Sequence, residues 1–249
     1  MSDPHRRYQA ADGPAFVTER RALLKWSSAA AIGALALGGR MPGFDMAKAF
    51  AAAGAQAGES VDLGKGDVGI LNYAYGLEQL EAAFYTQVTK SPYSNMESAD
   101  RDILTGIRDH EIAHRDFLKV ALKKEAIPDL EVDFSTVDFN SRDSVLTTAL
   151  TFENLGVGAY NGAGHLLKKE EYLLIAGKIV SVEARHAAAI RYLLASNAQA
   201  NADNNSSNHS NMPARVVNDK GLDQELAPGD VLSKAAPFVK THITAEHVG

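Results

Sequence analysis

The 249-residue sequence contains no cysteine. This absence excludes disulfides, thiolate zinc sites, iron–sulfur clusters and thiol nucleophiles, so any metal ion must be held by oxygen and nitrogen ligands. The chain also lacks an excess of basic residues, since its formal net charge is −6. Without a broad cationic surface there is no electrostatic basis for binding a phosphate backbone. We therefore expect no nucleic-acid partner.

Long hydrophobic runs are scarce as well. A mildly apolar run extends from Trp26 to Leu37, which is shorter than the roughly 20 residues that a helix needs to span a bilayer. We therefore expect no permanent membrane anchor.

The pair Arg20-Arg21 stands just before this run, and together they resemble a twin-arginine export signal. A short buried helix is the alternative interpretation. On the export interpretation, residues 1–49 are a signal peptide and spacer, residues 50–65 are a flexible N-terminal segment, and the mature protein is periplasmic or secreted.

Four later segments show apolar residues at helical spacing, at about 67–89, 98–125, 142–167 and 169–195. Asp67 is the expected cap of the first helix, and Ser98 or Asp100 that of the second. These segments predict an all-α domain over residues 66–195.

A linker from Ala126 to Ser141 separates the second and third helices. About sixteen extended residues reach roughly 50 Å, which exceeds the length of these helices. The linker can therefore join opposite ends of a bundle, and we predict a four-helix bundle with one long crossover between two helical hairpins.

Residues 196–249 begin with a stretch rich in Asn, Ser, Ala and Asp, a composition that cannot bury a core. The segment from Pro228 to Phe238 regains apolar residues. It is a candidate short helix that docks back on the bundle.

Two Glu-x-x-His pairs occur, Glu111/His114 and Glu183/His186, each within a predicted helix. Residues three apart share one face of a helix, so each pair can present a carboxylate and an imidazole to one metal ion. A single pair of this kind is weak evidence, because a solvated ion pair has the same pattern.

An internal repeat supports the two pairs. Leu77–Tyr85 aligns without gaps to Phe152–Tyr160 and places Glu78 opposite Glu153. In each half a Glu-x-x-His pair follows about thirty residues later. The order Glu, Glu-x-x-His, Glu, Glu-x-x-His is the ligand pattern of two-metal carboxylate bundles. The predicted metal ligands are Glu78, Glu111, His114, Glu153, Glu183 and His186.

The repeat also ranks the neighbouring residues. Glu81 aligns with Gly156, so Glu78 is the favoured ligand and Glu81 is only a candidate. Glu81 and His110 are interpreted as boundary residues. Tyr85 aligns with Tyr160. These tyrosines are either core aromatics or side chains that contact the carboxylates or take part in redox chemistry.

The predicted ligands lie within the apolar stripes of their helices. Glu78 shares a face with Leu71 and Ala74, and Glu183 shares one with Ile179. Four carboxylates in one core would each cost several kcal/mol if uncompensated. Two divalent cations would balance four carboxylates while the imidazoles stay neutral.

These residues resemble the ferritin-like superfamily, in particular the bacterial ferritin-like group that includes desiccation-related proteins. The resemblance covers about Gly66 to Ala195, and its marks are Leu-Glu-Gln-Leu-Glu-Ala-Ala-Phe-Tyr, His-Glu-Ile-Ala-His, Glu-Asn-Leu-Gly-Val-Gly-Ala-Tyr-Asn-Gly-Ala and Val-Glu-Ala-Arg-His-Ala-Ala.

The resemblance implies a ferritin-like four-helix bundle and a role for each ligand. It implies that Glu78 and Glu153 are terminal ligands and that Glu111 and Glu183 bridge the ions, while His114 and His186 each bind one ion. The chain departs from the pattern by its glycines at 156, 158, 162 and 164. They either widen access to the metals or permit close helix packing.

Nitrogen and oxygen ligands suit iron or manganese, although affinity alone does not select them over copper or zinc. The expected cofactor is two divalent Fe or Mn ions, and the expected activity is a reaction with peroxide or dioxygen in stress protection, of catalase, peroxidase or ferroxidase type. Two alternatives stay open: a non-catalytic stress, desiccation or surface protein that metal stabilises, and an iron-storage protein. A homo-oligomer is also left open.

Overall fold

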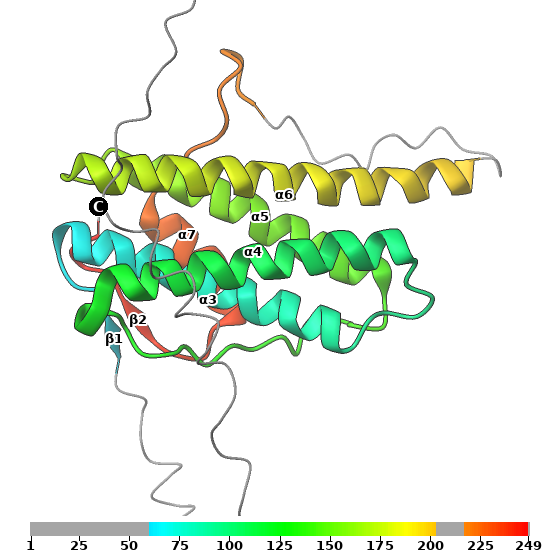
Figure 1. The fold of residues 1–249 in the computed structure, drawn as a ribbon, viewed down its shortest axis with the longest axis horizontal. Helices are drawn as coiled ribbons and strands as arrows, with labels where there is room; N and C mark the ends of the chain where they lie inside the picture. The colour runs from blue at the N-terminus through cyan, green and yellow to red at the C-terminus, as the bar shows by residue number, and fades with distance from the viewer. Residues whose placement is uncertain (1–59, 203–216, 249) are drawn as a thin grey trace, which may run out of the picture. The chain divides into compact units, whose positions relative to one another are not determined.

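The computed structural model describes residues 60–202 and 217–248 (Figure 1), with side chains described as far as residue 195 in the first range. The predicted export signal and spacer, residues 1–49, and residues 50–59 of the predicted flexible segment lie outside the described residues. Most of the Asn/Ser-rich stretch, residues 203–216, also lies outside them.

Four long helices form two antiparallel hairpins (Figure 1). The helices are α3 (Gly66–Lys90), α4 (Ser98–Leu122), α5 (Arg142–Gly164) and α6 (Glu170–Ala202). Helix α3 packs mainly against α4, and α5 packs mainly against α6. The prediction of an all-α four-helix bundle is confirmed. No helix in the described part of the chain is both long and apolar enough to cross a membrane.

The helix ends differ from the prediction in a few places. Helix α4 ends at Leu122 because the backbone of Lys123 has a positive φ of 56°, which does not continue the helix. A 3-10 turn, η1 (Lys123–Glu125), follows. Helix α6 continues to Ala202, beyond the predicted end at 195.

The predicted helix caps were wrong. Neither Asp67 nor Asp100 caps its own helix: α3 and α4 begin without a side-chain cap. The Asp67 carboxylate instead accepts hydrogen bonds from the backbone N–H groups of Lys168 and Lys169, which lead into α6. Asp100 accepts hydrogen bonds from Tyr93 and Arg142. Each carboxylate therefore joins separate parts of the bundle.

The linker after η1 runs along the bundle as predicted (Figure 1). Near its start, the backbone N–H groups of Ile127 and Leu130 donate to the buried side chains of Asn72 and Gln79 on α3, at 3.0 and 2.7 Å. At its other end, Asn140 accepts a backbone hydrogen bond from the loop after α3. The crossover thus covers α3 from one end to the other, and this explains why so much of α3 is buried.

The C-terminal segment docks on the bundle. It forms the short helix α7 (Pro228–Ala235), the 3-10 turn η3 (Ala236–Phe238) and strand β2 (Ile243–Thr244), which pairs in parallel with β1 (Val61–Asp62). The ring of Phe238 packs edge-on against Phe152 of α5, with centroids 4.8 Å apart. The predicted short docking helix is confirmed.

Two glycines of α5 permit this docking. The backbone N–H of Leu226 donates to the carbonyl oxygen of Gly158 at 2.9 Å. A Cβ atom at Gly162 would lie 1.9 Å from the carbonyl oxygen of Leu226, a distance that no side chain can occupy. At these two positions, glycine serves close packing and not access to the core.

Candidate metal centre

Four helices each contribute to a buried cluster of glutamate and histidine side chains in the core. Glu78 comes from α3, the Glu111/His114 pair from α4, Glu153 from α5 and the Glu183/His186 pair from α6. The four glutamates have no exposed surface. The spacing of three in each Glu-x-x-His pair places both side chains on the inward face of one helix. The structure therefore brings together all six residues that the sequence predicted as ligands.

The ligand atoms form two groups, and within each group they lie within 4.8 Å of one another. The first group is Glu78, Glu111, His114 and Glu183, and the second is Glu111, Glu153, Glu183 and His186. Glu111 and Glu183 belong to both groups. Two neighbouring ions that share two carboxylates are the arrangement that these groups would accommodate.

Each imidazole faces several carboxylates through its Nδ1 atom. His114 Nδ1 lies 3.1 Å from Glu183 Oε1 and 3.4 Å from Glu78 Oε2. His186 Nδ1 lies 2.7 Å from Glu111 Oε1 and 3.4 Å from Glu153 Oε2. The two halves of the cluster are thus arranged alike, as the sequence repeat leads one to expect.

A tyrosine from each half of the repeat donates a hydrogen bond to a glutamate of the other half. The Tyr85 hydroxyl donates to Glu153 Oε1 and the Tyr160 hydroxyl donates to Glu78 Oε1, both at 2.5 Å. The structure decides between the two interpretations of these residues in favour of contact with the carboxylates. Each hydroxyl occupies one oxygen of its glutamate and leaves the other directed to the cluster.

The buried carboxylates have strongly shifted pKa values. Burial raises the pKa of Glu78 to about 8, and the charge of Glu111 opposes its ionisation further. Burial and the charges of Glu78 and Glu111 raise the pKa of Glu183 well above its usual range. Burial alone would also raise the pKa of Glu111, but its contacts with His114 and His186 lower it to about 2.

The pKa values of the two imidazoles are raised by the neighbouring carboxylates. Burial would lower the pKa of His114, but Glu111, Glu183 and Glu78 raise it to about 12. The same balance, with Glu111 and Glu153 as the nearest carboxylates, raises the pKa of His186 to about 10. Without a cation, this core favours protonated imidazoles at His114 and His186 and a neutral carboxyl group at Glu78, which limits its net charge.

Many buried polar atoms of the cluster are unpaired within the part of the chain that the structure describes. Eight buried oxygen and nitrogen atoms of the six residues have no hydrogen-bond partner among the described residues, although several lie close together. Buried polar atoms normally have partners, and leaving them unpaired is costly. Two cations would satisfy these atoms at once, and a set of carboxylate oxygens and imidazole nitrogens fits iron or manganese. The residues therefore fit a two-metal centre.

Comparison with protein families agrees with this geometry. A model of the ferritin-like domain matches residues 66–196, a little over half of the chain. The chain belongs to the ferritin-like domain family. No curated protein matches the sequence significantly. The matched region ends at residue 196, within α6, and does not include the C-terminal segment that docks on α5.

This ferritin-like core holds a fifth buried glutamate, Glu81, which the sequence left as a candidate ligand behind Glu78. Glu81 is only 3% exposed, so its interpretation as a boundary residue was wrong. Burial, followed by the charges of Glu183 and Glu111, raises its pKa well above the usual range. A Cβ atom at Gly156 would lie 3.2 Å from Glu81 Oε1 and 3.0 Å from Glu183 Oε2. Gly156 therefore leaves room for both carboxylates, and the alignment of Glu81 with Gly156 was the available signal.

His110 makes a second contact that the sequence did not predict. It is exposed, as a boundary residue should be, but its Nδ1 lies 2.9 Å from Nε2 of His186 and the two rings are stacked. Nδ1 of His186 therefore faces the carboxylates, while its Nε2 contacts His110. A second contact of this kind commonly orients a histidine ligand. The repeat places Val182 at the position equivalent to His110. The two imidazoles of this ferritin-like domain thus have different surroundings.

Proposed function

We propose that this ferritin-like protein binds a carboxylate-bridged di-iron or di-manganese centre and reacts with peroxide or dioxygen in protection against stress. The observation that carries the proposal is the sharing of Glu111 and Glu183 by two otherwise separate groups of ligands. Two adjacent ions would supply a two-electron redox change divided between them.

The side chains would divide the work as follows. Glu78 and His114 would bind one ion, Glu153 and His186 the other, and the two shared carboxylates would bind both. Tyr85 and Tyr160 would hold the outer glutamates in place by the hydrogen bonds that they already donate. Burial of the four glutamates and of His186 would limit the access of bulk water to the ions.

We further propose that the protein acts in the periplasm or outside the cell. The support is the pair Arg20-Arg21 followed by a short apolar run. A twin-arginine route carries folded proteins, so the metal would be loaded in the cytoplasm before export. Native protein that is recovered from the periplasm without metal, and that binds it only when metal is added, would count against this order of events.

The test begins with elemental analysis of protein isolated from its native host, followed by assays of peroxide consumption and of ferrous iron oxidation. The proposal predicts two Fe or Mn ions per chain and turnover in at least one assay. Metal-loaded protein that neither consumes peroxide nor oxidises ferrous iron would refute the redox function.

A second candidate is a non-catalytic protein whose bundle the metal stabilises. The burial of five carboxylates in one core favours this candidate, because cations would stabilise such a core whether or not the protein turns over a substrate. A Glu111→Ala variant separates the two candidates. Loss of metal with unfolding of this variant, and no turnover by the wild type, would favour the structural role.

A further inference from the structure

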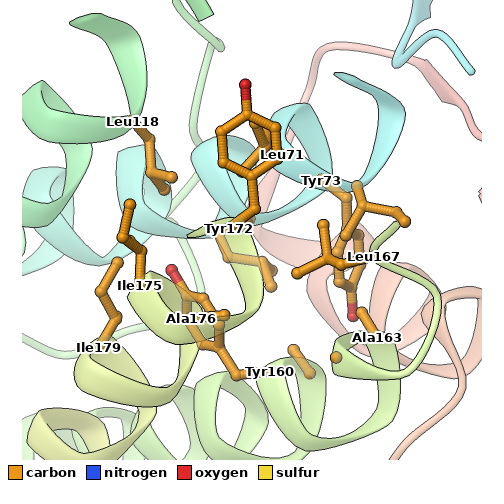
Figure 2. A pocket seen from close by; sticks show the side chains of 15 residues that line it. Leu71, Tyr73, Leu118, Tyr160, Ala163, Leu167, Tyr172, Ile175, Ala176 and Ile179 are labelled. Atoms are coloured by element: carbon orange, nitrogen blue, oxygen red, sulfur yellow. The ribbon is translucent and has the colours of Figure 1, made fainter. Parts of the chain in front are cut away.

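An apolar pocket lies close to the candidate metal centre, and its lining includes Tyr172 and Ile175 from the first two turns of α6. All four helices of the bundle line it, and Figure 2 shows the side chains of Leu118, Tyr160, Ile175 and Ile179 around it. None of the predicted metal ligands lines the pocket, so it is a separate feature of the core.

The inner side of the pocket borders the ligand cluster. Tyr160 forms part of the wall, and its hydroxyl donates to Glu78 Oε1 at 2.5 Å. Three other lining residues, Ala74, Leu118 and Ile179, each stand four positions from a predicted ligand on the same helix. Four positions correspond to about one helical turn. Lining residues thus flank the cluster on three helices, and Tyr160 touches it directly.

The wall of the pocket is almost entirely carbon. Its hydroxyl groups belong to tyrosines, and that of Tyr160 is already bound to Glu78. The buried hydroxyl of Tyr73 has no hydrogen-bond partner among the described residues. A molecule in the pocket could therefore gain very few hydrogen bonds.

The size of the pocket limits its occupant. Its cavity volume is about 20 Å³, whereas a water-sized molecule needs roughly 10–15 Å³. It admits one or two very small molecules and excludes an organic substrate with a long chain. Among small oxidants, hydrogen peroxide would lose its hydrogen bonds to water on entry, at a cost of roughly 2–7 kcal/mol per unpaired hydroxyl. Dioxygen is apolar and pays no such cost.

We propose that this pocket binds dioxygen and passes it along the ring of Tyr160 to the ligand cluster. The part of the proposal that concerns delivery rests on the proposed function, whereas binding of dioxygen by the pocket does not. Dioxygen, and not peroxide, is the oxidant that uses this route.

Binding is tested by NMR, because dissolved dioxygen is paramagnetic and speeds the relaxation of methyl groups that it contacts. The full chain is prepared with zinc, a d10 ion without redox chemistry, and oxygen pressure is then applied. Ile179 lines the pocket, and Ile190 is a matched control, buried on the same helix but not in the pocket. We expect at least a threefold larger relaxation enhancement at Ile179. Equal enhancement at the two residues would overturn the proposal.

Two phenylalanine variants test whether the relaxation enhancement at Ile179 arises in the pocket. Ala176 lines the pocket and is only partly buried, so Ala176→Phe should fill the space, while Ala188→Phe adds the same ring to an exposed position of α6. The first variant should reduce the enhancement at Ile179 to the level of Ile190, and the second should not change it. If Ala176→Phe does not fold, the smaller Ala176→Leu replaces it. Full enhancement in the filled variant would overturn the proposal.

A kinetic experiment on the iron-loaded protein tests delivery. The ratio of the oxidation rate with dioxygen to that with peroxide should fall at least tenfold in Ala176→Phe and stay constant in Ala188→Phe. Equal slowing with both oxidants would contradict a route used by dioxygen alone. A wild-type protein that reacts with neither oxidant refutes the proposed function, and the NMR experiment then still decides whether the pocket binds dioxygen.

Discussion

A Glu183→Gln substitution should remove the stability that metal gives the bundle and leave the metal-free protein almost unchanged. Glu183 is one of the two carboxylates shared by both groups of ligands. Burial and the charges of Glu78 and Glu111 raise its pKa well above the usual range, so the folded, metal-free protein favours the neutral carboxyl group. A neutral carboxyl group and an amide have nearly the same shape, so the substitution introduces no new charge and no cavity.

The expected magnitude follows from mass action. An ion present at a hundredfold excess over its Kd stabilises the folded state by about 2.7 kcal/mol. For a domain of this size, each kcal/mol shifts Tm by roughly 2–4 °C. Metal should therefore raise the Tm of the wild type by about 5–11 °C per bound ion. Without metal, the variant and the wild type should agree within about 0.5 kcal/mol.

Thermal unfolding followed by circular dichroism, with chelator and then with added Mn²⁺ or Fe²⁺ under anaerobic conditions, measures both effects. The matched control is Glu171→Gln, an exposed position in the first turn of the same helix, which should retain the full metal-dependent increase. A Glu183→Gln variant that keeps this increase would refute the assignment of Glu183 as a shared ligand.

Three further predictions concern pH, the C-terminal segment and a buried ion pair. Without metal, the folded protein holds protons that the unfolded chain releases, since the folded-state pKa of Glu78 is about 8 and its unfolded value is about 4.3. The stability of the metal-free protein should therefore fall as pH rises from 5 to 8, while metal affinity rises. A Tm difference between the metal-bound and the metal-free protein that does not widen with pH would contradict this. Gly162→Ala would place a Cβ atom 1.9 Å from the carbonyl oxygen of Leu226. We expect the free energy of unfolding in urea to fall by about 1–3 kcal/mol and limited proteolysis of the C-terminal segment to become faster; unchanged proteolysis would show that the docking tolerates a methyl group. Asp100→Asn removes the negative charge that Arg142 Nε contacts at 2.7 Å and should cost about 3 kcal/mol in urea unfolding. Burial raises the pKa of Asp100 less than its contacts with Arg142 and Tyr93 lower it, so the cost should be present above pH 4 and shrink in acid; a cost that does not change between pH 3 and pH 7 would count against the ion pair.

The helices and the six-residue cluster were accessible from the sequence because each rests on a local pattern. Apolar spacing gives the helix faces, and the spacing of three in Glu111/His114 places two side chains on one face whatever the tertiary structure. The internal repeat supplied the remaining information by pairing Glu78 with Glu153. The assignment of the six side chains as metal ligands remains a prediction that their proximity supports.

The features that the sequence did not indicate depend on contacts between distant segments. Glu81 is buried because Gly156, on another helix, leaves room for its carboxylate. Asp67 was expected to cap its own helix, yet it binds the backbone before α6, a partner about a hundred residues away. Leu226 docks on the glycines of α5 through backbone atoms, which carry no residue-type signal. Such pairings appear only when the helices are placed in space.

Anomalous diffraction at the absorption edge of the bound metal would show directly whether two ions share the core of the bundle. We predict two anomalous peaks per chain, one beside Glu78 and His114 and the other beside Glu153 and His186, with Glu111 and Glu183 in contact with both. A single peak in the core, or metal bound only elsewhere on the chain, would contradict it.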